Sequence, residues 1–174
     1  MTAGLEYNRD RLKDNMWGYD RHTDQTVNIY SAFLQNEWKN ERWSILVGGR
    51  LDKHNMVDNI IFSPRANLRF NPTQNINLRL SYSSGFRAPQ AFDEDMHIEN
   101  VGGTVAMIER TKNLKEEKSQ SFSASADIYH RFGAFQTNFL IEGFYTKLTD
   151  VFVLGEPYNR GDGVLVKLRS NGPG

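Results

Sequence analysis

The chain has 174 residues, with 21 basic and 21 acidic side chains, 39% hydrophobic residues and no cysteine. Zero net charge argues against a nucleic-acid partner, because proteins that bind nucleic acids normally carry an excess of basic residues. The lack of Cys excludes a disulfide framework, a thiolate metal site and a cysteine nucleophile. A mean hydropathy of -0.61 and short apolar runs exclude a membrane-spanning helix, but a transmembrane β-barrel stays open because its strands alternate apolar and polar residues.

Strand patterns dominate the chain. The clearest run is 75–83, where Ile76, Leu78, Leu80 and Tyr82 alternate with polar residues. A period of two places the apolar side chains on one face of a strand and the polar ones on the other. In chain order, the predicted strands are 4–9, 27–38, 43–52, 65–70, 75–83, 119–130, 134–148 and 163–169.

The connections between these strands alternate in length. Residues 39–42, 71–74 and 130–133 are tight turns, and the other connections are long: 10–26, 53–63, 85–116 and 150–162. Every second connection therefore lies at the same end of the sheet. We expect an all-β fold, an antiparallel up-and-down meander of about eight strands.

Aromatic residues and strand length favour a membrane wall over a soluble sheet. Trp38 and Trp43 flank one short turn, and Phe70 and Phe132 lie beside the other two, as expected where strands meet lipid headgroups. Runs 119–130 and 134–148 exceed the usual ~5–6 residues of globular strands and suffice to cross a bilayer. The opposite face is rich in polar and charged residues, which predicts a wide, hydrated lumen: Ser31, Gln35, Glu37, Arg50, Asp52, Arg65, Asn67 and Arg69.

Several motifs in order resemble those of TonB-dependent outer-membrane receptors. Residues 82–90 (YSSGFRAPQ) resemble the "sFRAP" signature, and 113–119 (NLKEEKS) resemble "NPxLKPEkS" with both family prolines replaced. Residues 33–38 (FLQNEW), 47–52 (VGGRLD) and 63–65 (SPR) resemble "fxQxEW", "GxRxD" and "sPR". The motif sequences are most similar to those of receptors of Bacteroidetes type. The resemblance covers nearly the whole chain from about residue 27.

The resemblance implies a 22-stranded barrel in the outer membrane of a Gram-negative bacterium. In that family an N-terminal plug fills the barrel, and a TonB box couples it to the TonB complex. No signal peptide, plug, TonB box or barrel-closing strand is visible in this sequence. We therefore expect residues 1–174 to be a partial barrel whose contact with TonB lies in another part of the receptor.

Candidate ligand-binding residues lie in the long connection after the FRAP-like motif. Phe86, Arg87, Phe92 and His97 are the loop candidates for ligand contact. Phe86 and Phe92 offer stacking surfaces. Arg87 either contacts the ligand or pairs with Asp93 or Glu94 to fix the departure of the loop.

His97 lies in the interval where haem receptors of the family carry an axial iron ligand, so the resemblance implies haem as one possible transported ligand. The acidic residues Asp93, Glu94, Asp95 and Glu99 form either a hard-cation site or a solvated loop.

The leading hypothesis is a fragment of an active transport receptor for an iron complex, haem or a cobalamin-like ligand. We find no enzyme signature in the sequence, and we expect no resident cofactor. The expected partners are outer-membrane lipid, the TonB complex and a small ligand. Two alternatives stay open: a small self-contained outer-membrane barrel with a structural or adhesive role, and a soluble β-sheet binding module.

Overall fold

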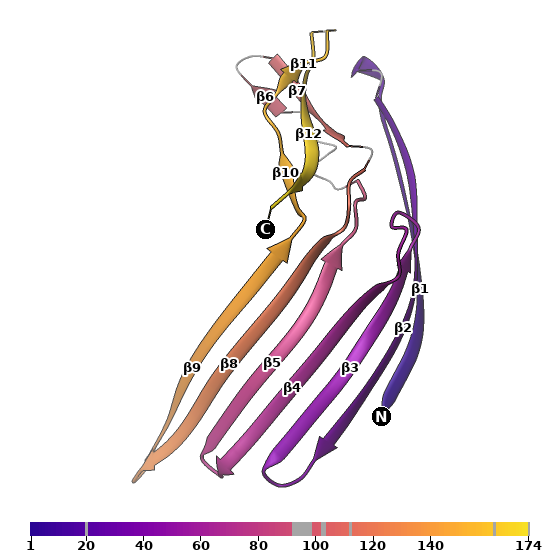
Figure 1. Ribbon diagram of the computed structural model, residues 1–174. Helices are drawn as coiled ribbons and strands as arrows, with labels where there is room; N and C mark the ends of the chain where they lie inside the picture. The colour runs from indigo at the N-terminus through magenta and orange to yellow at the C-terminus, as the bar shows by residue number, and fades with distance from the viewer. Residues whose placement is uncertain (20, 92–98, 102–103, 112, 162, 174) are drawn as a thin grey trace.

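The computed structural model describes residues 1–19, 21–91, 99–101, 104–111, 113–161 and 163–173. Within these residues the chain forms two β-sheets, which we name the main sheet and the small sheet (Figure 1). The only helical element in the described ranges is a short 3-10 turn, η1 (Trp17–Tyr19). None of the helical structure described has the length and apolar character needed to cross a membrane.

The main sheet is an antiparallel meander with strand order β1-β2-β3-β4-β5-β8-β9 in the described residues. Neighbouring strands are paired by backbone hydrogen bonds along most of their length, so the sheet is one continuous curled layer (Figure 1). Its strands are β1 (Thr2–Met16), β2 (Arg21–Lys39), β3 (Trp43–His54), β4 (Ile61–Thr73), β5 (Ile76–Arg87), β8 (Glu117–Phe132) and β9 (Phe135–Thr149).

Short turns close one end of the main sheet, which we call the turn end. In the β2–β3 turn, the side-chain oxygen of Asn40 accepts hydrogen bonds from the backbone N–H groups of Arg42 and Trp43, at 3.0 and 2.8 Å. This is the local chemistry by which Asn favours turns. The β8–β9 turn places Gly133 at a φ of 57°, a conformation that glycine adopts without steric cost.

The small sheet lies at the opposite end of the main sheet, which we call the loop end (Figure 1). Its strands are β6 (Glu99–Val101), β7 (Thr104–Arg110), β10 (Val151–Leu154), β11 (Tyr158–Asn159) and β12 (Leu165–Gly172). β12 pairs antiparallel with β10 and β11 and parallel with β7. Segments that follow β5 and β9 are thereby brought together.

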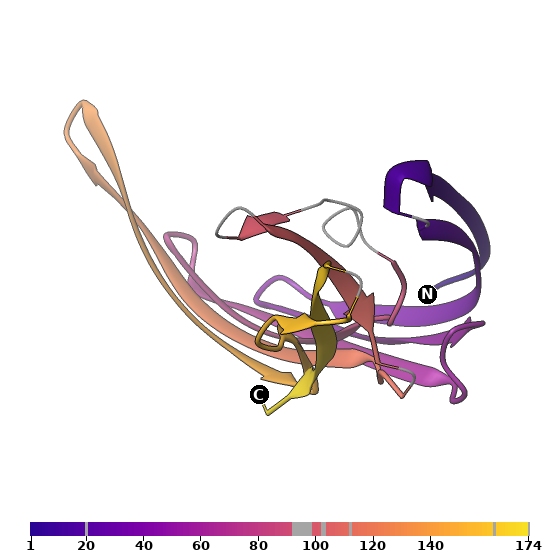
Figure 2. The same cartoon turned by 90° about the horizontal axis from the view of Figure 1, so that it is seen from above.

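The main sheet curls so that its two edge hairpins turn toward the same side, and the small sheet lies over this concave side (Figure 2). Buried apolar residues in the described part gather at the loop end: Val27, Val57, Ile61, Ala88, Ala106, Met107, Ile108 and Val166. The convex face has no second layer against it in the described residues, and large apolar side chains on it are exposed. The soluble alternative needed these side chains in a common core, so the arrangement argues against it.

The fold class expected from the sequence is confirmed, but the segment 10–26 is not a long loop. β1 runs to Met16 and β2 begins at Arg21, so these residues extend the first hairpin. Cross-strand ion pairs, Arg11–Asp24 at 2.9 Å and Arg21–Asp14 at 3.3 Å, join the extension. Most residues on both faces are polar there, so the segment lacks the regular apolar alternation on which the strand predictions relied.

The last predicted strand also lies elsewhere than expected. Residues 163–169 largely become β12, which belongs to the small sheet, so the meander has seven described strands and not eight. Val166 is fully buried in this position. A short apolar run indicates a strand but does not specify which neighbour it pairs with, because pairing depends on the fold around it.

Candidate functional site

The convex face carries an apolar band with aromatic residues at its borders. On the first hairpin, the convex-face side chains near the middle are Leu5, Tyr7 and Tyr30. Toward the loop end they are the charged residues Arg11 and Asp24. Tyr7 and Tyr30 stack at 4.8 Å, and the Tyr7 hydroxyl donates a 3.0 Å hydrogen bond to the side chain of Asn28. These tyrosines mark one border of the band.

The other border lies at the turn end, where Trp43 and Phe70 stack at 4.0 Å and Trp38 is exposed. The strand from Tyr30 to Trp38 is roughly 27 Å long at about 3.4 Å per residue. At a tilt of about 40°, this length spans roughly 21 Å, close to the apolar band of about 25 Å that barrel walls present to lipid. The convex face therefore has the dimensions of a hydrocarbon-facing wall.

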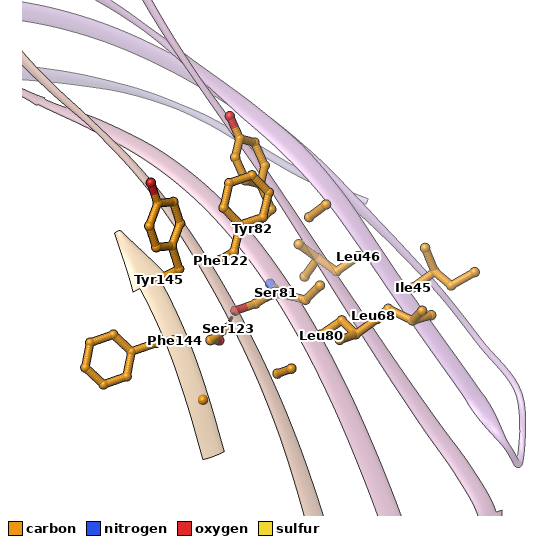
Figure 3. A pocket seen from close by; sticks show the side chains of 14 residues that line it. Ile45, Leu46, Leu68, Leu80, Ser81, Tyr82, Phe122, Ser123, Phe144 and Tyr145 are labelled. Atoms are coloured by element: carbon orange, nitrogen blue, oxygen red, sulfur yellow. Dashed lines mark hydrogen bonds between the residues drawn. The ribbon is translucent and has the colours of Figure 1, made fainter. Parts of the chain in front are cut away.

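A hollow of about 780 Å³ lies on this convex face. Figure 3 shows Tyr82, Phe122 and Tyr145, from three adjacent strands, beside the hollow. Tyr82 and Phe122 lie 4.8 Å apart. The small residues Ala124 and Gly143 also line it. Apolar atoms make up most of the lining of this open hollow, which suits contact with hydrocarbon.

A polar network lies on the concave face of β1, β2 and β3. The Arg50 guanidinium donates hydrogen bonds to Asp52 at 2.8 Å, to Glu6 at 2.9 Å and to the Ser31 hydroxyl at 2.7 Å. The Ser31 hydroxyl donates to Asp52 at 2.5 Å. Asp52 is only 2% exposed, and a buried carboxylate needs such partners to remain charged. The network fixes β1, β2 and β3 to one another.

Side chains at the loop end fasten the long connections to the main sheet. The buried Gln25 accepts a 2.7 Å hydrogen bond from the Ala91 backbone N–H, and its amide lies 3.9 Å from the Met56 sulfur. The Met56 backbone N–H donates in turn to Nδ1 of the buried His54 at 3.0 Å. Arg110 on β7 donates to the Pro89 carbonyl at 3.0 Å. Three separate segments are thereby fixed around one space.

That space is a cleft of about 460 Å³. Arg21 and Thr23 of β2, Met56, Ala91 and Arg110 are among its lining residues. Glu109 also lines it and forms an ion pair with Arg160 at 3.0 Å. The volume falls within the ~300–1,000 Å³ typical of small-molecule sites, and the mixture of arginine, hydroxyl and apolar groups suits an anionic ligand with apolar parts.

The predicted site residues that the structure describes are not among the lining residues of this cleft. Phe86 packs against the buried cluster of Val57, Ile61 and Ala88. The Arg87 guanidinium lies 5.7 Å from the centre of the Phe152 ring. Both residues therefore help to hold the loop end together, and their contact with a ligand stays a prediction.

Other predicted site residues fall where the structure gives no description. Phe92, His97 and the acidic run 93–95 lie outside the described residues, and so does the pairing of Arg87 with Asp93 or Glu94. For Glu99 only the backbone position in β6 is described. Among the residues that are described, no group of three His, Asp or Glu is placed to hold a metal ion. The haem and hard-cation predictions remain untested.

The arginines of the cleft were missed by sequence reasoning. Arg21 and Arg110 lie inside the segments 10–26 and 85–116, which the sequence predicts as loops, and they are 89 positions apart in the chain. No local pattern joins such distant positions. Pro89 and Ala91, which also line the cleft, stand in or directly after the FRAP-like motif, so the motif pointed to the correct region.

A curled sheet with a hydrocarbon-sized outer band, a polar inner face and a cleft among its long loops defines part of a membrane β-barrel wall. The family model for the β-barrel of TonB-dependent receptor-like proteins matches residues 1–169. The chain therefore belongs to the TonB-dependent receptor β-barrel family, whose members are outer-membrane proteins of Gram-negative bacteria.

Solved structures with similar folds include siderophore receptors. The chain is similar to the siderophore receptor PirA from Pseudomonas aeruginosa, with a TM-score of 0.80, 16% identity and coverage of 98% of this chain and 33% of that one. It is also similar to the ferric enterobactin receptor PfeA in complex with BCV-L6, with a TM-score of 0.73, 17% identity and coverage of 98% and 28%.

A third similar structure is the FrpB iron transporter from Neisseria meningitidis, with a TM-score of 0.57, 16% identity and coverage of 86% of this chain and 22% of that one. The chain thus spans a third or less of the solved receptors that it matches. At these identities the likeness establishes the fold alone. A search of curated proteins found no match.

Proposed function

We propose that this chain supplies part of the wall and the ligand-capturing loops of an outer-membrane receptor that imports a small iron complex of the siderophore type. The chain's contribution is binding and guidance, not catalysis. Energy comes through TonB and a plug carried by other parts of the receptor. The iron complex is cargo, and the proposal requires no resident cofactor.

The cleft at the loop end carries this proposal. Its two arginines, Arg21 and Arg110, come from opposite sides, β2 and β7, and Met56 adds an apolar contact. Guanidinium groups bind carboxylate or catecholate oxygens through charge-assisted hydrogen bonds. Two proteins of similar structure, a siderophore receptor and a ferric enterobactin receptor, support the same class of ligand.

A binding measurement on the full-length receptor that contains this chain tests the proposal. With ferric enterobactin as the probe, we expect the double substitution Arg21→Gln and Arg110→Gln to weaken binding at least tenfold, about 1.4 kcal/mol. Arg11→Gln is the matched control, since Arg11 also forms a hairpin ion pair but lies outside the lining of the cleft. The control should bind as the unmodified receptor does.

A second variant keeps the result readable if the double variant folds poorly. Thr23→Trp fills the cleft without changing its charge, and we expect it to reduce binding of the same probe. Unchanged binding in both variants would contradict the proposed site. Binding of haemin with a Soret shift that His97→Ala abolishes would instead favour the haem prediction.

A further inference from the structure

Gln25 on β2 is a buried polar side chain that lies next to the cleft but is not one of its lining residues. Thr23 and Arg21, two and four positions before it on the same face of the strand, do line the cleft. A buried amide costs free energy unless its polar atoms are hydrogen-bonded. The contacts that Gln25 makes must therefore offset the cost of burying it.

Both ends of the Gln25 amide contact residues that line the cleft. Oε1 accepts a 2.7 Å hydrogen bond from the backbone N–H of Ala91, and Nε2 lies 3.9 Å from the Met56 sulfur. Ala91 and Met56 are 66 and 31 positions from Gln25 in the chain, and both are lining residues. Because a single amide group contacts both, its span limits the distance between these two parts of the lining.

The two contacts of Gln25 differ in strength. The bond to Ala91 is a short N–H···O bond, whereas a thioether sulfur is a weak acceptor. The backbone of Met56 is held separately, because its N–H donates to Nδ1 of His54 at 3.0 Å, and an unbranched Met side chain adapts readily to its surroundings. The cleft therefore has a firmly held side at Ala91 and an adjustable one at Met56.

The segment that contains Ala91 has a second attachment, but of a different kind. Arg110 donates a 3.0 Å hydrogen bond to the Pro89 carbonyl. Arg110 also lines the cleft, so its remaining donors are available to a ligand. Gln25 holds the same segment from β2 and stays outside the lining, so its effect on a ligand passes through the residues that it holds.

We propose that Gln25 is a positioning residue that sets the separation of Ala91 and Met56 and thereby determines which iron complexes fit the cleft. Selectivity is a difference between two affinities, so a change in this separation alters the affinity ratio of two complexes of unequal size. The inference rests on the proposed function, because it takes the cleft as the site of the iron complex.

The substitution Gln25→Leu in the full-length receptor tests this inference. Leucine has a similar size, but it neither accepts the Ala91 N–H nor donates to Met56. We measure the Kd values of two probes, ferric enterobactin and the smaller ferric citrate, and expect their ratio to change at least fivefold. A general loss of structure would weaken the binding of both probes by a similar factor and leave the ratio as it was.

Gln35→Leu is the matched control. Gln35 lies on the same face of β2, ten positions further along, and outside the lining of the cleft. This variant should keep the ratio of the unmodified receptor. Hydrogen exchange measured by mass spectrometry adds a readout without ligand: Gln25→Leu should speed exchange of the Ala91 amide at least tenfold, because its N–H loses its acceptor, and Gln35→Leu should leave it unchanged.

Met56→Leu keeps the proposal testable if Gln25→Leu folds poorly. This swap conserves volume and is normally well tolerated, but it removes the sulfur that Gln25 contacts. We expect the Kd ratio to change at least twofold while exchange at Ala91 stays slow. In the double variant the two effects should not add, because both substitutions remove the same contact.

Two results would overturn the inference: a Kd ratio that Gln25→Leu and Met56→Leu both leave unchanged, or an Ala91 amide that exchanges as slowly in Gln25→Leu as before. The double substitution Arg21→Gln and Arg110→Gln separates this failure from that of the proposed function. If it leaves binding intact, the cleft is not the site and both proposals fail. If it weakens binding while Gln25→Leu leaves the ratio unchanged, the positioning role alone fails.

Discussion

The two faces of the main sheet are built from the same strands and differ in almost every physical property. The convex face exposes bulky apolar side chains such as Leu80 and Phe139, 55% and 59% exposed, with no polar group to satisfy. The concave face places charged and hydroxyl groups beside one another and connects them by hydrogen bonds, as in the Ser31–Asp52–Arg50 network. The difference indicates that a single-layer sheet is stable only when its apolar face contacts hydrocarbon and its polar face contacts water.

The largest expected effect comes from placing a charge on the convex face. Leu80→Arg should reduce the free energy of unfolding of the receptor in lipid vesicles by about 2–4 kcal/mol, the cost of an arginine at the bilayer midplane. Asn67→Arg, at nearly the same height on the concave face, should cost less than about 1 kcal/mol. Urea titration measures both. Equal costs of the two substitutions would contradict the conclusion that the two faces contact different media.

The next effect tests the buried ion pair on the concave face. Arg50→Met leaves Asp52, only 2% exposed, without its guanidinium partner. We expect a loss of about 2–3 kcal/mol of unfolding free energy, below the range for fully buried pairs because Arg50 itself is partly exposed. Arg11→Met removes an exposed ion pair and should have a much smaller effect. If Arg11→Met cost more unfolding free energy than Arg50→Met, the network would not stabilise the sheet.

Two glycines on the convex face differ in the space beside them. A Cβ at Gly49 would lie 2.5 Å from the Phe62 ring, whereas a Cβ at Gly143 would have nothing within 4 Å. Gly49→Ala should therefore cost about 1–3 kcal/mol through overpacking, and Gly143→Ala should change the unfolding free energy by less than about 0.5 kcal/mol. The same titration checks both, and a harmless Gly49→Ala would show that Phe62 moves aside.

The smallest effect is a pH dependence in the extension of the first hairpin, beyond the apolar band. The hydrogen bond from Arg11 lowers the pKa of Asp24 below its usual range. The pair therefore contributes stability above the ordinary carboxyl pKa, and the contribution is lost as pH falls through the lowered value. NMR titration of the Asp24 carboxyl group checks this, with Arg11→Gln expected to return the pKa to its usual range. An unchanged pKa in that variant would contradict the assignment.

The sequence predicted the main sheet wherever one face meets an apolar medium and the other meets water. Residues 75–83 show this clearly, since Leu78 and Leu80 lie on the convex face and Arg79 and Ser81 on the concave face. The pattern fails in the hairpin extension, where polar residues such as the buried Gln25 occupy the concave face and Arg11 and Asp24 the convex face. Without an alternation of apolar and polar residues, the sequence gives no sign of a strand.

The cleft was predictable only in part. The FRAP-like motif indicated the region, because Phe86 and Ala88 pack in the cluster beneath the loops. Arg21 and Arg110 were not predictable, because their proximity depends on how β7 lies over the concave side. Long-range placement of this kind comes from the tertiary fold and leaves no local signal in the sequence.

The parallel pairing of β7 with β12 has a consequence for the order of assembly. All but one of the pairings in the main sheet join strands that follow one another directly in the chain, so each forms by closing a short connection. Ala106 and Leu165, which are register partners in β7 and β12, are far apart in sequence, and their contact requires closure of a much longer chain segment at a correspondingly higher entropic cost. We therefore expect the hairpins of the main sheet to form before β7 pairs with β12.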